Sequence, residues 1–245
     1  MTYLPYLVGF DTETTGVNVF EDRIVTASIV YVDPVGNIID NYEWLVNPGI
    51  DIADGAAEVH GITTEHAKEF GADPAVSVYG VASTLAYFMS SGVPVVAYNG
   101  AFDFSLLEYE IQRHLSTSGY SGFSSFFTSR ETPKMLIDPY VLDNSYDKYR
   151  PGGRTLTKTS EFYGISLENA HASYDDCLAA VGVARALWDR FERLQNAPMD
   201  DLWDKQVEWY AEQQNSLAEY FEKQGKTLDD PINTEWPIRR RIDSV

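Results

Sequence analysis

Three short apolar segments at the start of the chain constrain its fold more than any other feature. They span residues 3–10, 24–31 and 38–46, and the second is rich in β-branched residues. The sequence Asp33-Pro-Val-Gly-Asn37, which is typical of a turn, separates the second segment from the third. We therefore expect three adjacent strands, the last two joined as a hairpin.

Strand and helix alternate in the next part of the chain. Short apolar runs predict strands, and apolar residues three and four apart predict helices. The expected strands are 92–99 and 135–138, and the expected helices are 75–89, 101–115, 156–163 and 173–194. Residues 116–133 have no clear period and are expected to form a loop, and residues 146–153, with Arg-Pro-Gly-Gly, an exposed loop. This order predicts an α/β fold with a mixed central sheet flanked by helices.

The last fifty residues have a different character. Apolar side chains recur there at helical spacing, which predicts an amphipathic helix over 199–223 followed by an extended tail over 227–245. The apolar face of this helix docks on the parent domain, on a partner such as a polymerase, or on a second copy of the chain. We divide the chain into a domain, 1–194, and a C-terminal helical extension, 195–245.

Composition excludes several classes of protein. With 44% hydrophobic residues among 245, the chain is not disordered throughout, and no apolar run is long enough to span a membrane. A single cysteine, Cys177, and a start unlike a signal peptide fit a cytoplasmic location. The formal net charge of -19 at first argues against a polyanionic partner such as DNA.

A few carboxylates occur where they are locally unfavourable. Asp11 and Glu13 follow the first strand and point to one face, where burial is costly unless a cation neutralises them. They could instead cap a turn, since Thr14 follows. Asp103 lies in the first turn of a helix, where capping is the ordinary role. Ligands of open α/β sheets collect at the carboxyl ends of strands, where all three acids would meet.

A histidine and a fourth acid complete this group. His171 precedes a helix and Asp176 lies in its first turns, so both can face one site. Four converging carboxylates without thiolates suit Mg²⁺ or Mn²⁺, and two such ions could promote phosphodiester hydrolysis. Histidine titrates near neutral pH, so His171 suits a general base that takes a proton from water.

Three motifs in order carry a family resemblance. They are Phe10-Asp-Thr-Glu-Thr-Thr-Gly16, Tyr98-Asn-Gly-Ala-Phe-Asp103, and His171 followed after four residues by Asp176. Together they resemble the DEDD exonuclease superfamily, and within it the histidine-containing (DEDDh), DnaQ-like proofreading group. The resemblance spans roughly residues 5 to 194 and implies a ribonuclease H-like fold.

The resemblance also implies residue roles. Two divalent cations, Mg²⁺ or Mn²⁺, would be held by Asp11, Glu13, Asp103 and Asp176, with His171 as the general base. Thr14 would contact the 3′-terminal sugar, and His60 and Phe102 would lie near the terminal base. The implied activity is 3′–5′ hydrolysis of mainly single-stranded DNA, releasing nucleoside 5′-monophosphates. Alternatives are an RNA exonuclease of the same group, or a polymerase-associated protein that docks through residues 199–223.

The charge does not forbid this substrate. Two cations would neutralise four of the 37 acids and attract phosphate, whereas the remaining charge opposes long-range capture of a polyanion. We expect weak, salt-sensitive binding to nucleic-acid duplex, confined to the 3′ end and the 148–154 loop. Lys148, Arg150 and Arg154 are candidates for holding the trailing strand. The chain would bind DNA 3′ ends in preference to RNA.

Overall fold

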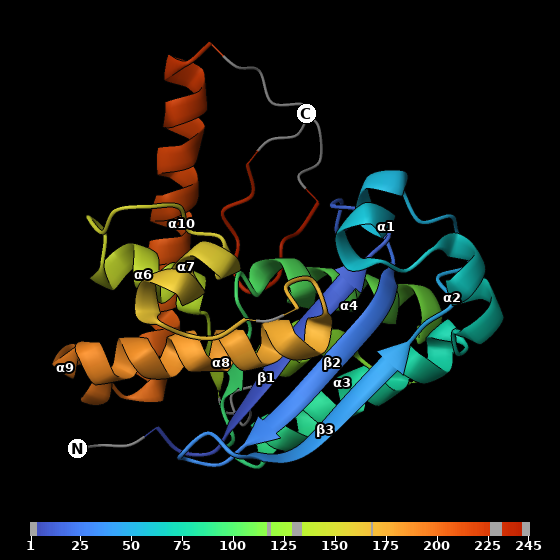
Figure 1. The fold of residues 1–245 in the computed structure, drawn as a ribbon, viewed down its shortest axis with the longest axis horizontal. Coiled ribbons are helices and arrows are strands. Elements are labelled where there is room, and N and C mark those ends of the chain that lie inside the picture. The colour runs from blue at the N-terminus through green and yellow to red at the C-terminus, as the bar shows by residue number, and fades with distance from the viewer. Residues whose placement is uncertain (1–3, 117–118, 129–133, 168, 226–231, 242–245) are drawn as a thin grey trace.

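Five strands form one mixed sheet at the centre of the protein (Figure 1). The computed structural model describes residues 4–116, 119–128, 134–167, 169–225 and 232–241. The strand order is β3-β2-β1-β4-β5, in which β1, β2 and β3 pair antiparallel and β4 and β5 run parallel to β1. Their bounds are Leu7–Thr14, Ile24–Val32, Ile38–Leu45, Val95–Val96 and Leu136–Ile137. The predicted mixed sheet is confirmed.

The alternation of side chains along β1 separates the core from the site. Val8 and Phe10 point into the main hydrophobic core. Gly9 and Asp11 point to the opposite face, because successive strand residues alternate. A Cβ at Gly9 would lie 2.8 Å from the carbonyl oxygen of Cys177, so only glycine lets the neighbouring helix approach β1 this closely.

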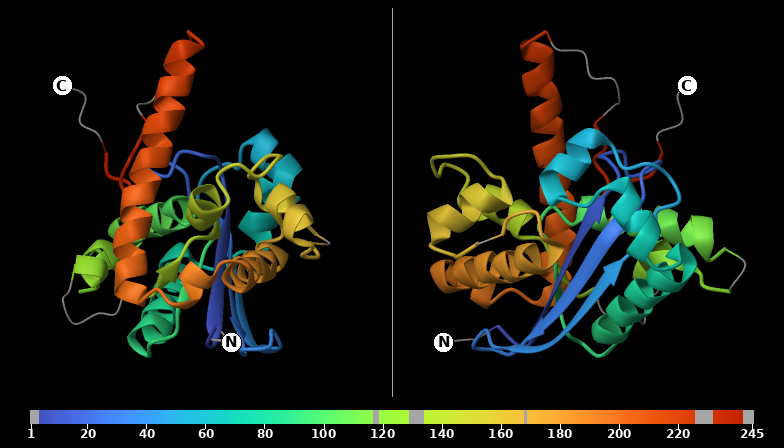
Figure 2. Two further views of the ribbon diagram at one scale, coloured as in Figure 1. Left: turned by 90° about the vertical axis from the view of Figure 1, so that its left-hand side faces the viewer. Right: turned by 45° about the vertical axis from the view of Figure 1, so that its right-hand side comes forward.

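Helices cover both faces of the sheet. Helices α3 (Pro74–Ser90) and α4 (Ala101–His114) lie on one side, and α8 (Ser173–Arg190) lies on the other with α7 (Leu156–Tyr163) against it (Figure 2). The long predicted helices thus agree with the observed ones to within a few residues. The predicted helix 173–194 ends at Arg190 and continues after a break as α9 (Glu192–Gln195).

Four short helices were not predicted. They are α1 (Asp54–His60), α2 (Thr64–Phe70), α5 (Gly122–Thr128) and α6 (Pro139–Tyr146). The expected loop over 116–133 is wrong at α5, and residues 117–118 and 129–133 lie outside the described residues. Helix α5 forms because Phe123 and Phe127 bury against Phe104, while Glu108 accepts hydrogen bonds from the Ser124 amide and hydroxyl at 2.9 and 2.8 Å.

The C-terminal helix α10 (Met199–Lys223) matches its predicted bounds. Its first half packs on the domain through Leu202, Trp203, Gln206 and Tyr210, and its second half projects from the body (Figure 1). Of the predicted tail, residues 232–241 are described and contain no helix or strand; Trp236 there is buried. No described helix combines the length and apolarity that a membrane span requires.

Candidate active site

The predicted acids meet at one end of β1. Asp11 and Glu13 lie on β1 itself, Asp103 begins α4, and Asp176 lies in the first turns of α8. A cavity of about 430 Å³ opens above them, lined by Asp11, Thr12, Glu13, Tyr98, Asn99, Tyr140, Arg154, Thr155, Leu156, His171 and Asp176. Asp103 is buried beside this cavity and accepts hydrogen bonds from the Thr12 amide (3.0 Å) and hydroxyl (2.7 Å).

Helix α8 is anchored to β2, which fixes the third motif. The Ser173 and Ser28 hydroxyls share a hydrogen bond of 2.7 Å, and the Cys177 thiol donates to the Ser28 carbonyl at 3.2 Å. His171 adopts φ 71°, a left-handed conformation uncommon for this residue. Its backbone N–H then donates to Asp176 Oδ2 at 3.3 Å, which places the histidine and the acid on the same wall of the cavity.

A buried carboxylate holds the turn that precedes Asp103. Asn99 lies in that turn with φ 58°, and its amide donates to Asp138 at 2.9 Å. The Gly100 amide donates to the same carboxylate at 3.0 Å, and the Tyr140 amide at 3.1 Å. Asp138 therefore connects the start of α4 to the start of α6, so two walls of the cavity share one anchor.

All four carboxylates have a raised pKa, and burial is the main cause for each. Burial raises the pKa of Asp11 well above its ordinary value, and the charges of the other three acids raise it further. Burial and the charges of Asp176 and Asp103 raise the pKa of Glu13 to about 8. The pKa of Asp103 rises to about 7 and that of Asp176 also rises, both mainly through burial. Charging all four acids is therefore unfavourable unless a cation joins them.

The donor set fits a hard divalent cation. Asp176 Oδ1 is buried and has no hydrogen-bond partner among the described residues, which leaves a lone pair for a metal. Glu13, His171 and Asp176 offer ligand atoms within 4.8 Å of one another. Apart from the imidazole, the convergent donors are carboxylate oxygens, which Mg²⁺ and Mn²⁺ prefer.

A second cavity adjoins the first and shares Glu13 and His171 with it. It measures about 450 Å³ and is further lined by Thr26, Ala27, Ser28, Glu43, Trp44, Leu45, His60, Ile62, Ala172, Ser173 and Tyr174. His60 Nε2 lies 3.2 Å from the Thr14 carbonyl, and its Nδ1 accepts from the Ile62 amide at 3.2 Å. Burial lowers the pKa of His60, so its ring is an uncharged surface.

Two predicted binding residues do not line these two cavities. Thr14 is buried, and its hydroxyl donates to the Gly16 carbonyl at 2.5 Å. Phe102 is half-buried and packs against the main core at the start of α4. The structure thus brings together the five predicted catalytic residues and His60, whereas Thr14 and Phe102 are not among the residues that line the two cavities.

A family model described as an exonuclease (RNase_T) matches residues 8–184. The chain belongs to this exonuclease family. It is accordingly a nuclease of the DnaQ-like DEDD superfamily, as its three motifs predict.

The exonuclease has relatives among replicative polymerases. The "DNA polymerase III PolC-type" of Streptococcus pneumoniae is 30% identical over 177 residues, a match that covers 69% of this chain and 10% of the relative. The same protein of Streptococcus thermophilus is 27% identical over 172 residues, with the same coverage. The chain therefore spans about a tenth of the length of these relatives.

Solved structures share its fold. Escherichia coli exonuclease I in complex with a dT13 oligonucleotide superposes with a TM-score of 0.65 at 20% identity, covering 78% of this chain and 42% of that one. The zinc-bound E. coli exonuclease I–ssDNA complex gives 0.66 at 19% identity, covering 87% and 45%. The predicted ribonuclease H-like fold is confirmed.

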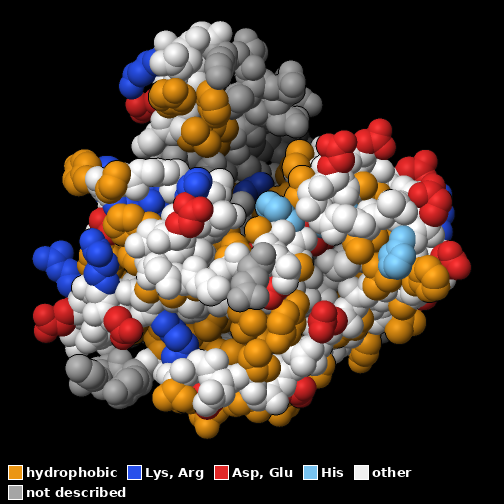
Figure 3. Space-filling view, viewed as in Figure 1, with side chains coloured by type: hydrophobic (Ala, Val, Ile, Leu, Met, Phe, Trp, Pro, Cys, Tyr) orange, Lys and Arg blue, Asp and Glu red, His pale blue; other side chains and the backbone are white. Residues whose placement is uncertain are grey.

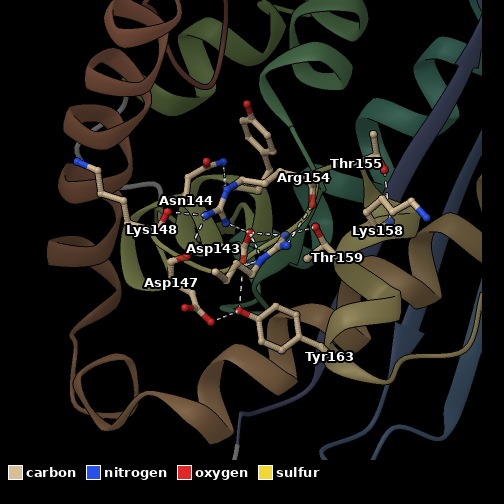
Figure 4. A network of polar contacts seen from close by, with 12 residues as sticks. Asp143, Asn144, Asp147, Lys148, Arg154, Thr155, Lys158, Thr159 and Tyr163 are labelled. Atoms are coloured by element: carbon tan, nitrogen blue, oxygen red, sulfur yellow. Dashed lines mark hydrogen bonds and ion pairs between the residues drawn. The ribbon is translucent and has the colours of Figure 1, made fainter.

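One expectation about the basic residues is wrong. The Arg150 side chain is 1% exposed and pairs with buried Asp143 at 2.8 Å, so it is a structural residue and the loop over 146–153 is not exposed throughout. Figure 4 shows the polar network around Asp143. Arg154 also pairs with Asp143 but lines the active-site cavity, and Lys148 is exposed. From the sequence, an arginine beside Pro-Gly-Gly is indistinguishable from a solvated loop residue, because its partner Asp143 lies in an unpredicted helix.

Two aromatic residues of the site were missed. Tyr140 lines the active-site cavity from α6, and Trp44 lines the second cavity from β3. Asp138-Pro139, a capping acid followed by proline, is the sequence signature that could have located α6 and hence Tyr140. Trp44 carries no comparable signature, since an aromatic residue in a strand is ordinarily part of a core.

Proposed function

We propose that the exonuclease removes nucleotides from the 3′ ends of mainly single-stranded DNA and releases nucleoside 5′-monophosphates. The observation that carries this proposal is the convergence of four carboxylates and His171 on one cavity, with Asp176 Oδ1 lacking a partner among the described residues. The relatives support it, since they are named as PolC-type DNA polymerases and as an exonuclease I bound to oligonucleotides.

Two divalent cations, Mg²⁺ or Mn²⁺, complete this site in the proposal. Asp11, Glu13, Asp103 and Asp176 would hold them. Such ions supply positive charge to the phosphate and make water more acidic. The protein's own contribution is to orient these ligands: Thr12 holds the Asp103 carboxylate through two hydrogen bonds, and the His171 amide holds Asp176.

His171 acts as the general base in this mechanism. It lies on the rim shared by the two cavities, so it can reach water on the solvent side of the phosphate. The imidazole accepts the proton as the water attacks, and the 3′ oxygen of the preceding nucleotide leaves. In this proposal the terminal nucleoside occupies the second cavity, with His60 near the base. Phe102 near the base and Thr14 near the sugar rest on the family resemblance, since neither residue lines that cavity.

A labelled-strand assay tests this function. Single-stranded DNA and RNA of equal length, labelled at the 5′ end, are incubated with Mg²⁺, with Mn²⁺ or with chelator. We expect a ladder that shortens from the 3′ end, faster on DNA, and no cleavage in chelator. Asp11→Ala should abolish the ladder, whereas Asp51→Ala, an exposed acid paired with Lys68, should leave it unchanged.

The same assay separates the base from the ligands. His171→Ala should lower kcat by about 10²–10⁴-fold, the usual contribution of a general base, while Mg²⁺ binding measured by calorimetry is largely retained. Cleavage that persists in chelator would overturn the metal mechanism, and shortening from the 5′ end would overturn the direction. Faster cleavage of RNA would favour the RNA exonuclease alternative.

The organisation of the chain completes the proposal. Residues 1–194 carry the chemistry as a catalytic domain, and residues 195–245 form an extension that begins with α10. A cytoplasmic location and association with a polymerase or a second copy through residues 199–223 stay part of this proposal. The projecting half of α10 supports an interaction there, since it stands clear of the domain (Figure 1).

A further inference from the structure

A third cavity, here called the α6–α10 groove, lies between α6 and α10. Its volume is about 780 Å³, larger than that of the active-site cavity. It is lined by Tyr140, Asn144, Ser145, Lys148, Trp209, Glu212, Gln213, Asn215, Ser216, Leu217, Glu219 and Tyr220. Figure 3 shows hydrophobic side chains on the part of α10 that stands away from the body. The projecting helix therefore forms one wall of an open groove.

The groove adjoins the active-site cavity. Tyr140 lines both the groove and the cavity above the carboxylates. Arg154 lines the active-site cavity, and its Nη2 donates to the backbone carbonyls of Asp147 (2.9 Å) and Lys148 (3.0 Å). Lys148 itself lines the groove. The hydrogen bond from the Arg154 side chain to the Lys148 carbonyl therefore connects the linings of the two cavities beside Tyr140.

Arg154 is a fixed cation at this junction. Its Nη1 pairs with Asp143, a fully buried carboxylate that also accepts from Arg150 and from the Tyr163 hydroxyl (Figure 4). Because Asp143 has several donors, the Arg154 guanidinium is held in place. It is the one arginine or lysine among the described residues that line the active-site cavity, so it is the described group there suited to a phosphate.

The lining of the groove suits nucleic-acid bases. It offers the rings of Tyr140, Trp209 and Tyr220, with amides and hydroxyls between them. Gln213 Nε2 donates to the Val141 carbonyl at 3.0 Å and to the Ser145 hydroxyl at 3.1 Å, which fixes this wall of the groove to α6. Base stacking on aromatic side chains tolerates any sequence, and it does not depend on positive charge.

Other occupants fit the groove less well. A hydrophobic peptide helix needs a row of apolar pockets, and Leu217 is the one aliphatic side chain among the described residues that line the groove. The negative charges of Glu212 and Glu219 offset the positive charge of Lys148, so binding of a strand through its phosphates alone is also disfavoured. Bases packed on the rings, with phosphates turned toward solvent, satisfy both restrictions.

We infer that the α6–α10 groove holds the single strand that trails behind the 3′ end, with Arg154 binding a phosphate at the junction and the rings stacking on bases. This inference rests on the proposed 3′–5′ activity. The site would thus extend from the carboxylates past Tyr140 and along the projecting half of α10. Substrates long enough to reach the groove should be bound more tightly than those that end at the carboxylates.

Substrate length is the test. The kcat/KM of the full chain is measured with Mg²⁺ on a DNA trinucleotide and on a DNA strand of about fifteen nucleotides. Tyr220→Ala should lower the ratio of long-strand to trinucleotide kcat/KM about tenfold, since a stacked base contributes about 1–3 kcal/mol. Tyr79→Ala is the matched control, because Tyr79 and Tyr220 are both 55% exposed helical tyrosines with one edge-on aromatic neighbour.

The outcomes are distinct. A ratio that falls for Tyr220→Ala and stays constant for Tyr79→Ala supports the groove as the strand's path. An unchanged ratio for Tyr220→Ala overturns it and leaves the groove to a different partner, such as a protein. An equal loss on both lengths also overturns it, because it places Tyr220 at the reaction rather than along the strand. If neither substrate is shortened by the unmodified chain, the proposed function fails instead.

Discussion

At the scale of single residues, the four carboxylates work against folding at neutral pH. Glu13 and Asp103 have pKa values of about 8 and about 7 in the fold, against ordinary values of 4.5 and 3.8. Between pH values of about 4 and about 8, these two carboxyl groups hold more protons in the folded protein than in the unfolded chain. The free energy of unfolding therefore falls as the pH rises from about 4 to about 8.

This loss of stability with rising pH should be measurable without metal and should become smaller when metal is bound. In chelator, we expect Tm at pH 8.5 to lie below Tm at pH 6, by on the order of 5 °C for a chain of this size. Saturating Mg²⁺ should shrink the difference, because the cation favours the ionised carboxylates. Thermal unfolding followed by circular dichroism at both pH values, with and without Mg²⁺, provides the measurement.

Two acids outside the four-carboxylate cluster also make the stability depend on pH. Burial raises the pKa of Glu110 to about 7 and that of Asp138 to about 6, and neither belongs to the four-carboxylate cluster. Their share of the pH dependence should persist in Mg²⁺. Glu13→Gln should remove much of the Mg²⁺-sensitive share. An identical pH slope with and without Mg²⁺ would show that no cation binds at this cluster.

The sequence is most informative about residues whose chemistry is local. Asp11, Glu13 and Asp176 could be assigned because their spacing along one strand or helix dictates a shared direction. Arg150 could not be assigned, since its role depends on Asp143, which lies seven residues away on a different element. A tertiary ion pair of this kind produces no repeating pattern in the sequence from which it could be predicted.

At the scale of elements, the first half of α10 closes an edge of the sheet. Strand β5 is the last in the order, so its outer backbone groups need partners. Gln206 supplies them: its Oε1 accepts from the Asp138 amide at 2.7 Å, and its Nε2 donates to the Leu136 carbonyl at 2.9 Å. One side chain thus replaces a neighbouring strand.

Removing this side chain should destabilise the fold. Gln206→Ala leaves a buried donor and a buried acceptor unpaired, which costs about 1–3 kcal/mol for each such group. We expect the midpoint of urea unfolding to fall accordingly. Gln214→Ala, on the same helix and with no side-chain hydrogen bond to the described residues, is the matched control. Equal midpoints for the two variants would contradict the structural role of Gln206.

Element length decides what the sequence reveals. Helices α3, α4, α7, α8 and α10 each span eight residues or more, and their apolar stripes made them predictable. Helices α1, α2 and α5 span seven residues each, too few to repeat a helical stripe twice. Helix α6 has eight, but its Pro-Tyr-Val-Leu start resembles a strand continuing from β5.

At the scale of the whole molecule, a net charge of -19 is compatible with a nucleic-acid substrate if binding is local, as we propose. The described cations beside the proposed strand path are Arg154 at the junction and Lys148 in the groove. Stacking on rings supplies affinity without counterion release. The protein should therefore bind single strands with little dependence on salt.

Salt titration measures this directly. For single strands, the slope of log K against log salt is about -0.7 for each phosphate contact, so two contacts predict about -1.4. Fluorescence anisotropy on the Asp11→Asn variant avoids cleavage during the titration. Arg154→Gln should make the slope shallower by about 0.7. A slope several times steeper would mean that a larger basic surface binds the strand, and tight binding to long duplex would contradict local binding.

Asp138 is contacted by two residues that lie far behind it in the sequence, and this has a consequence for biosynthesis. This carboxylate holds the turn before Asp103, yet Gln206 bonds to its backbone and the Trp236 indole donates to its side chain at 3.3 Å. Translation proceeds from the N-terminus, so both contacts form only after the ribosome has released nearly the entire sequence printed here. A nascent chain therefore carries every catalytic residue before it can finish the support beneath them. We expect nuclease activity to mature only after Trp236 has left the ribosome, well after the last catalytic residue, Asp176.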